Sequence, residues 1–234
     1  MMIWSIICAG GAGIRAGLEI PKQFLPICGK PMFLYSAETL SKMSEGVVMV
    51  CAEGYIGTAR ELSKRGKFSA EPIFSAGGKT RQQSVFNGLK CLKPFAQSDD
   101  IILIHDAARP FVTETDAKNA ANAAKAHGCS LLCARAVDTI KTAENVCGEL
   151  TVSGTLNRDN VFLAQTPQAA KFSIIFDAHE SAERENFSAT DDCSLLERLN
   201  FSPRIVISEG NNFKVTVKED FALAEYIAQH MLKL

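Results

Sequence analysis

The chain has 234 residues, of which 47% are hydrophobic, and its formal net charge at pH 7 is −1. This length and apolar content predict a single α/β domain over 1–234, and the near-zero charge gives no electrostatic basis for binding nucleic acid or a membrane surface. The apolar start 1–9 is too short for a spanning helix or a signal peptide, and eight cysteines without a C-x-x-C pair are typical of reduced thiols, so we expect a cytoplasmic protein.

Short apolar runs alternate with longer helical patterns along the chain. The runs predict strands at 3–9, 47–52, 71–75, 101–105, 130–134, 161–165 and 204–208. The longer patterns predict helices near 32–43, 55–66, 80–93, 114–127, 173–184, 191–199 and 218–232. Alternating strands and helices form a mostly parallel sheet covered on both faces, and ligands bind beyond the carboxyl ends of such strands.

A glycine-rich loop follows the first predicted strand. Glycine lets the backbone approach a ligand closely, and successive backbone N–H groups form an anion-binding concavity. Two cations, Arg15 and Lys22, follow where phosphate groups would lie. The loop therefore predicts a nucleoside triphosphate site, with the candidate contacts Ala9, Gly10, Gly11 and Gly13.

Three other interpretations of the glycines remain. Gly11-x-Gly13-x-x-Ala16 matches a dinucleotide-binding fingerprint, but that motif requires an acidic residue about 20 positions later, and Glu38 and Glu53 lie too far along. The phosphate loop of ATPases fails because Ile73 replaces its first glycine. A tight turn without a ligand is the third alternative.

A second glycine turn occupies 77–84. Its Gly78 backbone and the Ser84 hydroxyl suit a base or a ribose, and Arg81 lies between them in the sequence. The alternative is an ordinary glycine turn that leaves Arg81 on a solvated helix face.

An acidic motif, 105–110, follows the predicted strand 101–105. Asp106 at a strand end suits Mg²⁺ or a ribose hydroxyl, since Mg²⁺ usually takes one or two carboxylates together with phosphate oxygens and water. The small Ala107 favours close approach of a ligand. The alternative is an Asp106–Arg109 ion pair that braces the loop, and we expect a structural role for His105.

The segment 135–160 breaks the alternation. Two β-like runs, 137–142 and 148–152, are separated by a polar turn and predict a protruding hairpin. A two-stranded arm is marginally stable alone in water, so we expect this one to pack on another subunit.

Three further polar segments follow. Arg158 precedes 165–168, which we interpret as a polar turn before a helix. The segment 190–192 is typical of a helix N-cap with acidic residues in its first turn. Lys214 lies in an extended segment, where a lone lysine normally faces solvent.

Taken together, these motifs resemble those of the 2-C-methyl-D-erythritol 4-phosphate cytidylyltransferases, from about residue 3 to 228. The matching segments are 9–15, 21–26, 77–85, 105–110, 138–141, 164–168, 190–192 and 213–216. The resemblance implies a Rossmann-like α/β nucleotidyltransferase fold and a homodimer joined through the arm. It also implies transfer of CMP from CTP to methylerythritol phosphate, with Mg²⁺ as cofactor and pyrophosphate as the second product.

The resemblance also implies roles for individual residues. Arg15 and Lys22 would neutralise the triphosphate, and Asp106 would serve the ribose and the Mg²⁺ ion. The nucleotide would contact Ala9, Gly10, Gly11, Gly13, Gly78, Arg81, Ser84 and Ala107. The acceptor would contact Lys214, Thr166 and Thr190 of one subunit, and Thr139 and Arg158 of the partner's arm.

Three other functions stay open at this point. A ribitol 5-phosphate cytidylyltransferase would share the nucleotide half, and the segments 137–168 and 210–216 would decide between the two acceptors. An NAD-dependent oxidoreductase would need an acidic residue soon after the glycine loop. A non-catalytic nucleotide-binding regulator is disfavoured, because Arg15, Lys22, Asp106 and Lys214 all occur together.

Overall fold

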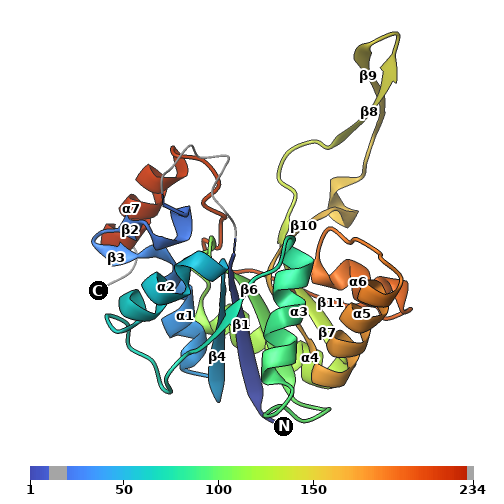
Figure 1. The fold of residues 1–234 in the computed structure, drawn as a ribbon. Coiled ribbons are helices and arrows are strands. Elements are labelled where there is room, and N and C mark those ends of the chain that lie inside the picture. The colour runs from blue at the N-terminus through green and yellow to red at the C-terminus, as the bar shows by residue number, and fades with distance from the viewer. Residues whose placement is uncertain (11–19, 231–234) are drawn as a thin grey trace.

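The computed structural model describes residues 1–10 and 20–230, so the predicted site residues Gly11, Gly13 and Arg15 lie outside the described residues. A seven-stranded sheet, in the order β11-β7-β10-β6-β1-β4-β5, forms its centre (Figure 1). The strands are β1 (Ile3–Ala9), β4 (Gly46–Cys51), β5 (Ile73–Ala76), β6 (Ile101–Asp106), β7 (Cys129–Arg135), β10 (Phe162–Lys171) and β11 (Arg204–Ile207). Only β10 runs antiparallel to its neighbours, which confirms the predicted mostly parallel sheet.

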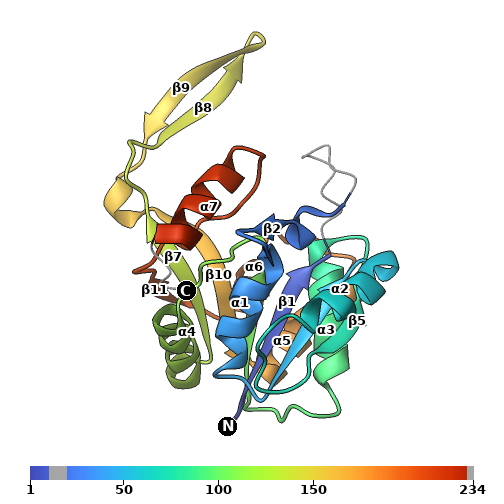
Figure 2. The ribbon, with the colours of Figure 1, turned by 90° about the vertical axis from the view of Figure 1, so that its left-hand side faces the viewer.

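Helices cover both faces of this sheet, as expected. They are α1 (Met32–Ser41), α2 (Ile56–Ser63), α3 (Arg81–Leu92), α4 (Glu114–His127), α5 (Phe172–Arg184) and α6 (Asp192–Arg198). Successive side chains of a strand point to opposite faces. Ile7 of β1 accordingly packs in the core under α1 and α4, and Ile6 packs in the core under α3 and α5. Figure 2 looks at the molecule from the side of α1.

A smaller cap lies beside the carboxyl end of β1. It contains the short helix η2 (Lys22–Phe24), the two-stranded sheet of β2 (Pro26–Ile27) and β3 (Lys30–Pro31), and the last helix, α7 (Asp220–His230). Ile227 of α7 and Val215 pack with Ile27 and Met32 in a core of their own. This packing anchors two segments of the chain, one just before β2 and one just before α7. The first carries the predicted site residue Lys22, and the second carries Lys214.

The predicted arm is a hairpin of β8 (Lys141–Val146) and β9 (Glu149–Thr155) that projects from the body (Figures 1 and 2). Its first strand begins later than the predicted run 137–142. The reason is the turn: Cys147 and Gly148 take φ of 54° and 92°. Two such residues form the tight loop that matches the twist of a hairpin, and the loop sets the register of both strands. A 3-10 turn, η4 (Arg158–Asn160), follows the hairpin.

Strand β10 corrects the interpretation of 165–168 as a turn before a helix. The strand does not end at 165 but continues to Lys171, and its pairing with β7 shifts register between Ala164 and Gln168. Proline has no N–H to donate to a ladder, so Pro167 fits such an irregularity without ending the strand. Polar residues that resemble a turn thus lie inside the sheet, beside the end of β6.

Helix length and apolar content decide whether a helix can cross a membrane. Over residues 1–10 and 20–230, no helix is both long enough and apolar enough to span a bilayer.

The buried carboxylate of Asp100 ties the start of β1 to the loop before β6. Its oxygens accept hydrogen bonds from the backbone N–H groups of Met2 at 2.7 Å and Gln97 at 3.0 Å, and from the Trp4 indole at 3.3 Å. Burial raises the pKa of Asp100, but these hydrogen bonds outweigh it and the pKa falls below its usual range. Deprotonated Asp100 therefore stabilises the fold.

We expect Asp100→Asn to lower the free energy of unfolding at pH 7 by about 1–3 kcal/mol, because donors are left without an ionised acceptor. The folded pKa lies below the unfolded one, so this stability is present above about pH 4 and is lost as the pH falls through the folded value. Urea unfolding at pH 7 and pH 3 measures both. Asp99→Asn is the matched control, since Asp99 is exposed and pairs only at the surface with Lys171; equal losses in the two variants would contradict the assignment.

Candidate active site

The loops that follow β1 and β5 both reach the first turn of α3. Ser84, buried in that turn, accepts a hydrogen bond from the Gly78 N–H at 3.0 Å and donates one to the Thr80 carbonyl at 2.9 Å. A Cβ atom on Gly10 would lie 3.3 Å from the Ser84 hydroxyl oxygen, and one on Gly77 would lie 3.0 Å from it. Both glycine loops therefore lie close to the Ser84 side chain, where a larger residue at either position would be crowded.

The end of β6 joins the same edge. Ala9 and Ala107 are both 1% exposed, and the Ala107 N–H donates to the Cys8 carbonyl at 3.1 Å. The side-chain amide of Gln23, from η2, donates to the Ala9 carbonyl. The three predicted motifs at strand ends thus converge, as far as their residues are described.

Asp106 lies at the centre of this convergence. It is buried, and its two oxygens accept hydrogen bonds from Arg81 Nε at 2.9 Å and Lys214 Nζ at 2.7 Å. Burial raises the pKa of Asp106, but the charges of Arg81 and Lys214 and the hydrogen bonds they donate outweigh it, so the pKa lies well below its usual range. The site therefore holds a permanent carboxylate between two cations.

These contacts argue against three of the alternatives that the sequence left open. Asp106 does not pair with Arg109, whose guanidinium donates instead to the Asn212 carbonyl at 2.7 Å. Lys214 does not simply face solvent, because its Nζ donates to Asp106. The two residues lie 108 positions apart in the sequence, so only the fold brings them together. Arg81 does not lie on a solvated face either.

Arg81 joins two carboxylates. Besides Asp106, its Nη1 donates to Asp192 at 2.8 Å, and Asp192 in turn contacts Nε2 of His179 at 3.1 Å. Burial lowers the pKa of Arg81, but the charges of Asp192 and Asp106 outweigh it and raise the pKa above its usual value. Asp192 and His179 are respectively 2% and 0% exposed in their side chains, so this chain of contacts runs into the core.

Two other ionisable groups beside Asp106 are neutral at pH 7. Burial lowers the pKa of His105 to about 4, and its ring contacts the Arg109 carbonyl at 2.9 Å and the Thr166 hydroxyl at 3.1 Å. Burial raises the pKa of Cys8 to about 12. At pH 7 this site therefore contains neither an imidazolium nor a thiolate. The buried ring of His105, bound to Arg109 and Thr166, fits the structural role predicted for it.

The segment 212–216 holds both site lysines. The Val215 N–H donates to the Ala108 carbonyl at 2.8 Å, and the Val215 carbonyl accepts from Lys22 Nζ at 2.6 Å. Asn212, 1% exposed, donates to the Thr166 carbonyl at 2.8 Å. The anchored segment thus carries Lys214 to Asp106 at the end of β6, and its backbone carbonyls bind Lys22.

Thr166 and Thr190 lie nearby but engage the protein. The buried Thr166 hydroxyl accepts from the Asp106 N–H at 3.0 Å. Thr190 contacts Ser194 at 3.2 Å, and Asp191 caps α6 by accepting from the Ser194 N–H at 2.9 Å, which confirms the predicted N-cap. Their contact with a substrate stays a prediction.

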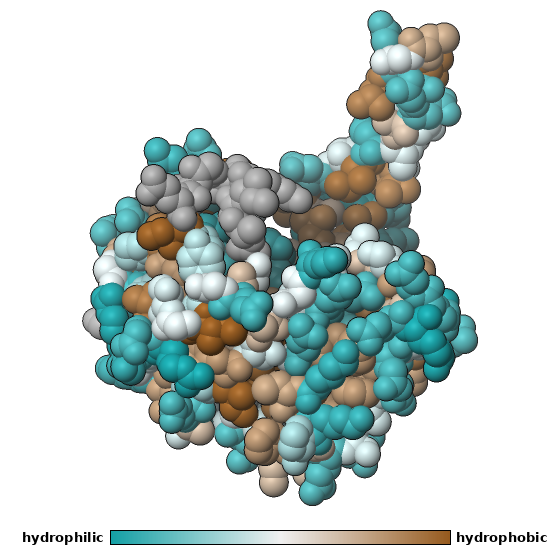
Figure 3. Space-filling model, viewed as in Figure 1, coloured by the Kyte–Doolittle hydropathy of each residue, from teal (hydrophilic) through white to brown (hydrophobic). Residues whose placement is uncertain are grey.

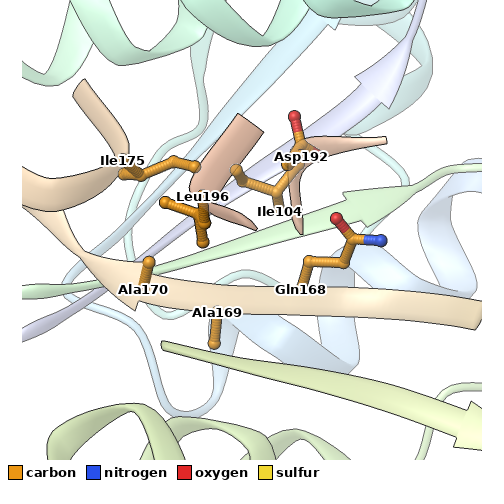
Figure 4. Close-up of a pocket in the computed structure, with 7 residues that line it drawn as sticks. All are labelled: Ile104, Gln168, Ala169, Ala170, Ile175, Asp192 and Leu196. Atoms are coloured by element: carbon orange, nitrogen blue, oxygen red, sulfur yellow. The ribbon is translucent and has the colours of Figure 1, made fainter. Parts of the chain in front are cut away.

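A small pocket lies behind Asp192 (Figure 4). Its lining is mostly apolar and consists of Ile104, Gln168, Ala169, Ala170, Ile175, Asp192 and Leu196. The Gln168 amide bonds to Asp191 at 2.7 Å and accepts from the Cys193 N–H at 2.9 Å. Since its polar groups already serve the start of α6, we assign the pocket to packing.

Thr139 and Arg158 are not brought to Asp106. Both are exposed at the base of the arm, and Arg158 donates to the Val137 carbonyl at 2.9 Å. Exposed apolar side chains lie on the arm, at Val146, Leu150 and Val152, and at its base, at Val137 and Leu156. Figure 3 shows brown, hydrophobic patches on this part of the molecule.

Metal-binding residues are sparse in the described part of the chain. Across 1–10 and 20–230, no group of three or more His, Cys, Asp or Glu side chains is placed to hold a metal ion. Mg²⁺ does not need such a group, because it takes one or two carboxylates and completes its shell with phosphate oxygens and water. Asp106 supplies one such ionised carboxylate, whose oxygens also accept hydrogen bonds from Arg81 and Lys214.

Sequence reasoning missed the support behind Arg81. His179 lies inside an amphipathic helix without any motif, and Asp192 has a sufficient explanation as a first-turn acid of α6. The signal that could have suggested more is the second of two consecutive aspartates, since one carboxylate is enough for the cap.

Comparison with known proteins shows which family this chain is similar to. A sequence profile described as 2-C-methyl-D-erythritol 4-phosphate cytidylyltransferase matches residues 3–230. A protein of that name from Geobacter metallireducens is 38% identical over 99% of this chain and 100% of its own length, and one from Clostridium botulinum is 36% identical over 97% of each. The crystal structure of a 4-diphosphocytidyl-2C-methyl-D-erythritol synthase from Anaerococcus prevotii superposes with a TM-score of 0.83 at 27% identity, over 97% of this chain and 98% of that one.

Proposed function

Because this chain belongs to the 2-C-methyl-D-erythritol 4-phosphate cytidylyltransferase family, we propose that the cluster around Asp106 is its active site. The chain is a cytidylyltransferase of the non-mevalonate isoprenoid pathway. It transfers CMP from CTP to 2-C-methyl-D-erythritol 4-phosphate, giving 4-diphosphocytidyl-2-C-methyl-D-erythritol and pyrophosphate. The observation that carries the site is the carboxylate of Asp106 between Arg81 and Lys214, at the sheet edge where two glycine loops lie close to Ser84.

In this proposal the strand-end loops hold the nucleotide. The backbone around Gly10 and Gly78, with Ser84, faces the cytidine, and Asp106 serves the ribose. The remaining nucleotide contacts are Ala9, Gly11, Gly13, Arg81 and Ala107. Arg15 and Lys22 lie on the triphosphate, where their charges meet the charge that develops on the leaving pyrophosphate.

The acceptor phosphate binds beside Lys214, with Thr166 and Thr190 at the edge of the same site. One of its oxygens attacks the α-phosphorus, and the bond from that phosphorus to the pyrophosphate oxygen breaks. The attacking oxygen is already anionic, so no general base is required, in keeping with the neutral His105 and Cys8. Positioning and charge stabilisation carry the rate.

We propose Mg²⁺ as the divalent cation of the reaction. The carboxylate oxygens of Asp106 would hold it together with the triphosphate. When bound, Mg²⁺ neutralises phosphate charge and polarises the α-phosphoryl group.

The first experiment measures pyrophosphate release from CTP and Mg²⁺ with methylerythritol phosphate and, separately, with ribitol 5-phosphate. Release with methylerythritol phosphate alone supports the proposal. Release with ribitol 5-phosphate alone would keep the chemistry and change the acceptor. Silence with both, together with binding of NAD, would return the oxidoreductase alternative.

We also propose that the chain is a single domain that works as a cytoplasmic homodimer. The exposed apolar side chains of the arm favour burial against a partner, and the eight cysteines are free thiols suited to a reducing compartment. Thr139 and Arg158, exposed on one subunit, would then reach the acceptor phosphate of the other.

Arg158→Ala is expected to raise KM for methylerythritol phosphate about tenfold or more, since one charge-assisted contact is worth about 1.5–3 kcal/mol. Mixed with a Lys22→Met variant under conditions of subunit exchange, it should regain activity, because one of the two sites in each heterodimer is intact. The control is each variant alone. No recovery in heterodimers isolated by two affinity tags would contradict a shared site.

A further inference from the structure

A line of polar contacts connects Asp106 to the interior of the protein. The carboxylate binds Arg81, Arg81 binds Asp192, and Asp192 binds His179, with distances of 2.9, 2.8 and 3.1 Å. These residues come from the end of β6, the starts of α3 and α6, and the middle of α5. The line therefore crosses three helices on one face of the sheet.

We propose that Asp192, held by His179, is a positioning residue that fixes Arg81 and through it the catalytic carboxylate of Asp106. The inference rests on the proposed function, because it assigns Asp106 to the reaction. Neither Asp192 nor His179 touches a substrate in this arrangement. Arg81 then contributes to the nucleotide site chiefly by holding Asp106.

The first argument is geometric. A long arginine side chain has many rotamers, and one carboxylate fixes it poorly. Asp106 engages Nε of Arg81 and Asp192 engages Nη1, so the two carboxylates hold different nitrogens of the same planar fork from different elements. Without Asp192, only Asp106 would orient Arg81. Asp106 is the residue whose own position Arg81 is proposed to fix, so a second carboxylate is needed.

The second argument concerns His179. Its ring stacks on Phe86 at 5.8 Å with an interplanar angle of 18°, which fixes the direction of Nε2 toward Asp192. Its Nδ1 is buried and has no hydrogen-bond partner among the described residues. A buried polar atom without a partner costs stability, and a leucine or phenylalanine would fill the space without that cost. A contact that holds Asp192 accounts for the histidine.

The third argument is charge balance. Asp106 and Asp192 carry two negative charges, and Arg81 and Lys214 carry two positive ones. Arg109 also lies near Asp106 but donates to carbonyls. Asp192 balances part of the positive charge of Arg81. The guanidinium can therefore be buried at this site while Asp106 still pairs with Lys214.

The test compares Asp192→Asn with Asp191→Asn, a matched variant that loses the same charge one residue earlier and can still cap α6. We expect Asp192→Asn to lower kcat about 10- to 100-fold, as displaced catalytic groups do, with KM for the acceptor changed less than about threefold. Asp191→Asn should keep kcat within about twofold. His179→Phe keeps the stacked ring and should lower kcat about threefold.

A readout independent of turnover follows the Arg81 side chain. In ¹H–¹⁵N spectra of the protein without substrates, the Arg81 Nε–H signal, assigned with Arg81→Lys, should exchange slowly with water. Exchange at least about tenfold faster in Asp192→Asn, but not in Asp191→Asn, supports the inference. Variants whose melting temperatures fall equally would show that stability is not the cause of different kcat values.

Two results would overturn the inference: an Asp192→Asn protein with wild-type kcat, or one whose Arg81 signal is unchanged. Failure of the proposed function looks different. There the wild-type protein would release no pyrophosphate, while the Arg81 signal would still respond to Asp192→Asn.

Discussion

Replacing Lys22 with methionine will lower kcat about 100- to 1000-fold and leave KM for CTP within about threefold. Lys22 Nζ lies against the carbonyls of 215 and 216, next to Lys214 and the end of β6. Its charge matters most when negative charge builds up on the departing pyrophosphate, so its loss affects the transition state more than the bound substrate. We expect the same split for Arg15→Ala, because the proposed function assigns Arg15 to the triphosphate as well.

Steady-state kinetics with both substrates varied measure this split. Lys30→Met is the matched control, because it removes the same charge from the neighbouring β3. Lys30 pairs there with Glu38 of α1. Lys22→Arg, which keeps the charge, should recover part of kcat. A Lys22→Met enzyme with near-normal turnover would remove Lys22 from the reaction. Equal melting temperatures for the two methionine variants would exclude a loosened cap as the explanation.

The sheet and its helices could be predicted because the responsible signals are local. Alternating apolar runs and helical spacing identify strands and helices from a few neighbouring residues. The ends of parallel strands must then share one edge, so the sequence alone is enough to place Gly10, Gly78 and Asp106 together. Only the backbone position of a strand end is needed for that argument.

The pairing of charges could not be predicted in the same way. Asp106 has Arg109 three residues away, and the local choice is a salt bridge between them. The fold instead turns Arg109 toward the Asn212 carbonyl and brings Arg81 and Lys214 to Asp106 from 25 and 108 positions away. Which of the three cations pairs with Asp106 depends on contacts between segments that are distant in the chain, and local sequence does not report these contacts.

The misread segment 165–168 has a similar cause. Gln165, Thr166, Pro167 and Gln168 have turn-like composition, but their polar side chains meet partners inside the protein. Thr166 accepts from the Asp106 N–H, and Gln168 serves the start of α6. Composition reports that polar groups need partners. It does not report whether water or a neighbouring strand and helix supplies them.

Asp106→Asn will impair both stability and catalysis, and the two losses have different origins. The neutral amide leaves Arg81 with Asp192 alone and leaves Lys214 without a carboxylate. Breaking a buried ion pair costs about 3–5 kcal/mol, but Lys214 is 43% exposed and water screens its charge, so we expect a loss of about 2 kcal/mol. In the proposed site, catalysis would also lose a ligand of the ribose and the metal ion, so kcat/KM for CTP should fall at least about 100-fold.

Lys214→Met separates the two losses. It removes the exposed cation of the pair and keeps Asp106 bound to Arg81, so the free energy of unfolding should change by less than about 1 kcal/mol. Its kcat/KM for the acceptor should still fall about 100-fold, because the acceptor phosphate loses its lysine. Urea unfolding and initial rates on the two variants measure both quantities. If Asp106→Asn were as stable as Lys214→Met, the ion pair between Asp106 and Arg81 would not contribute to stability. If Asp106→Asn kept wild-type turnover, the reaction would not centre on the end of β6.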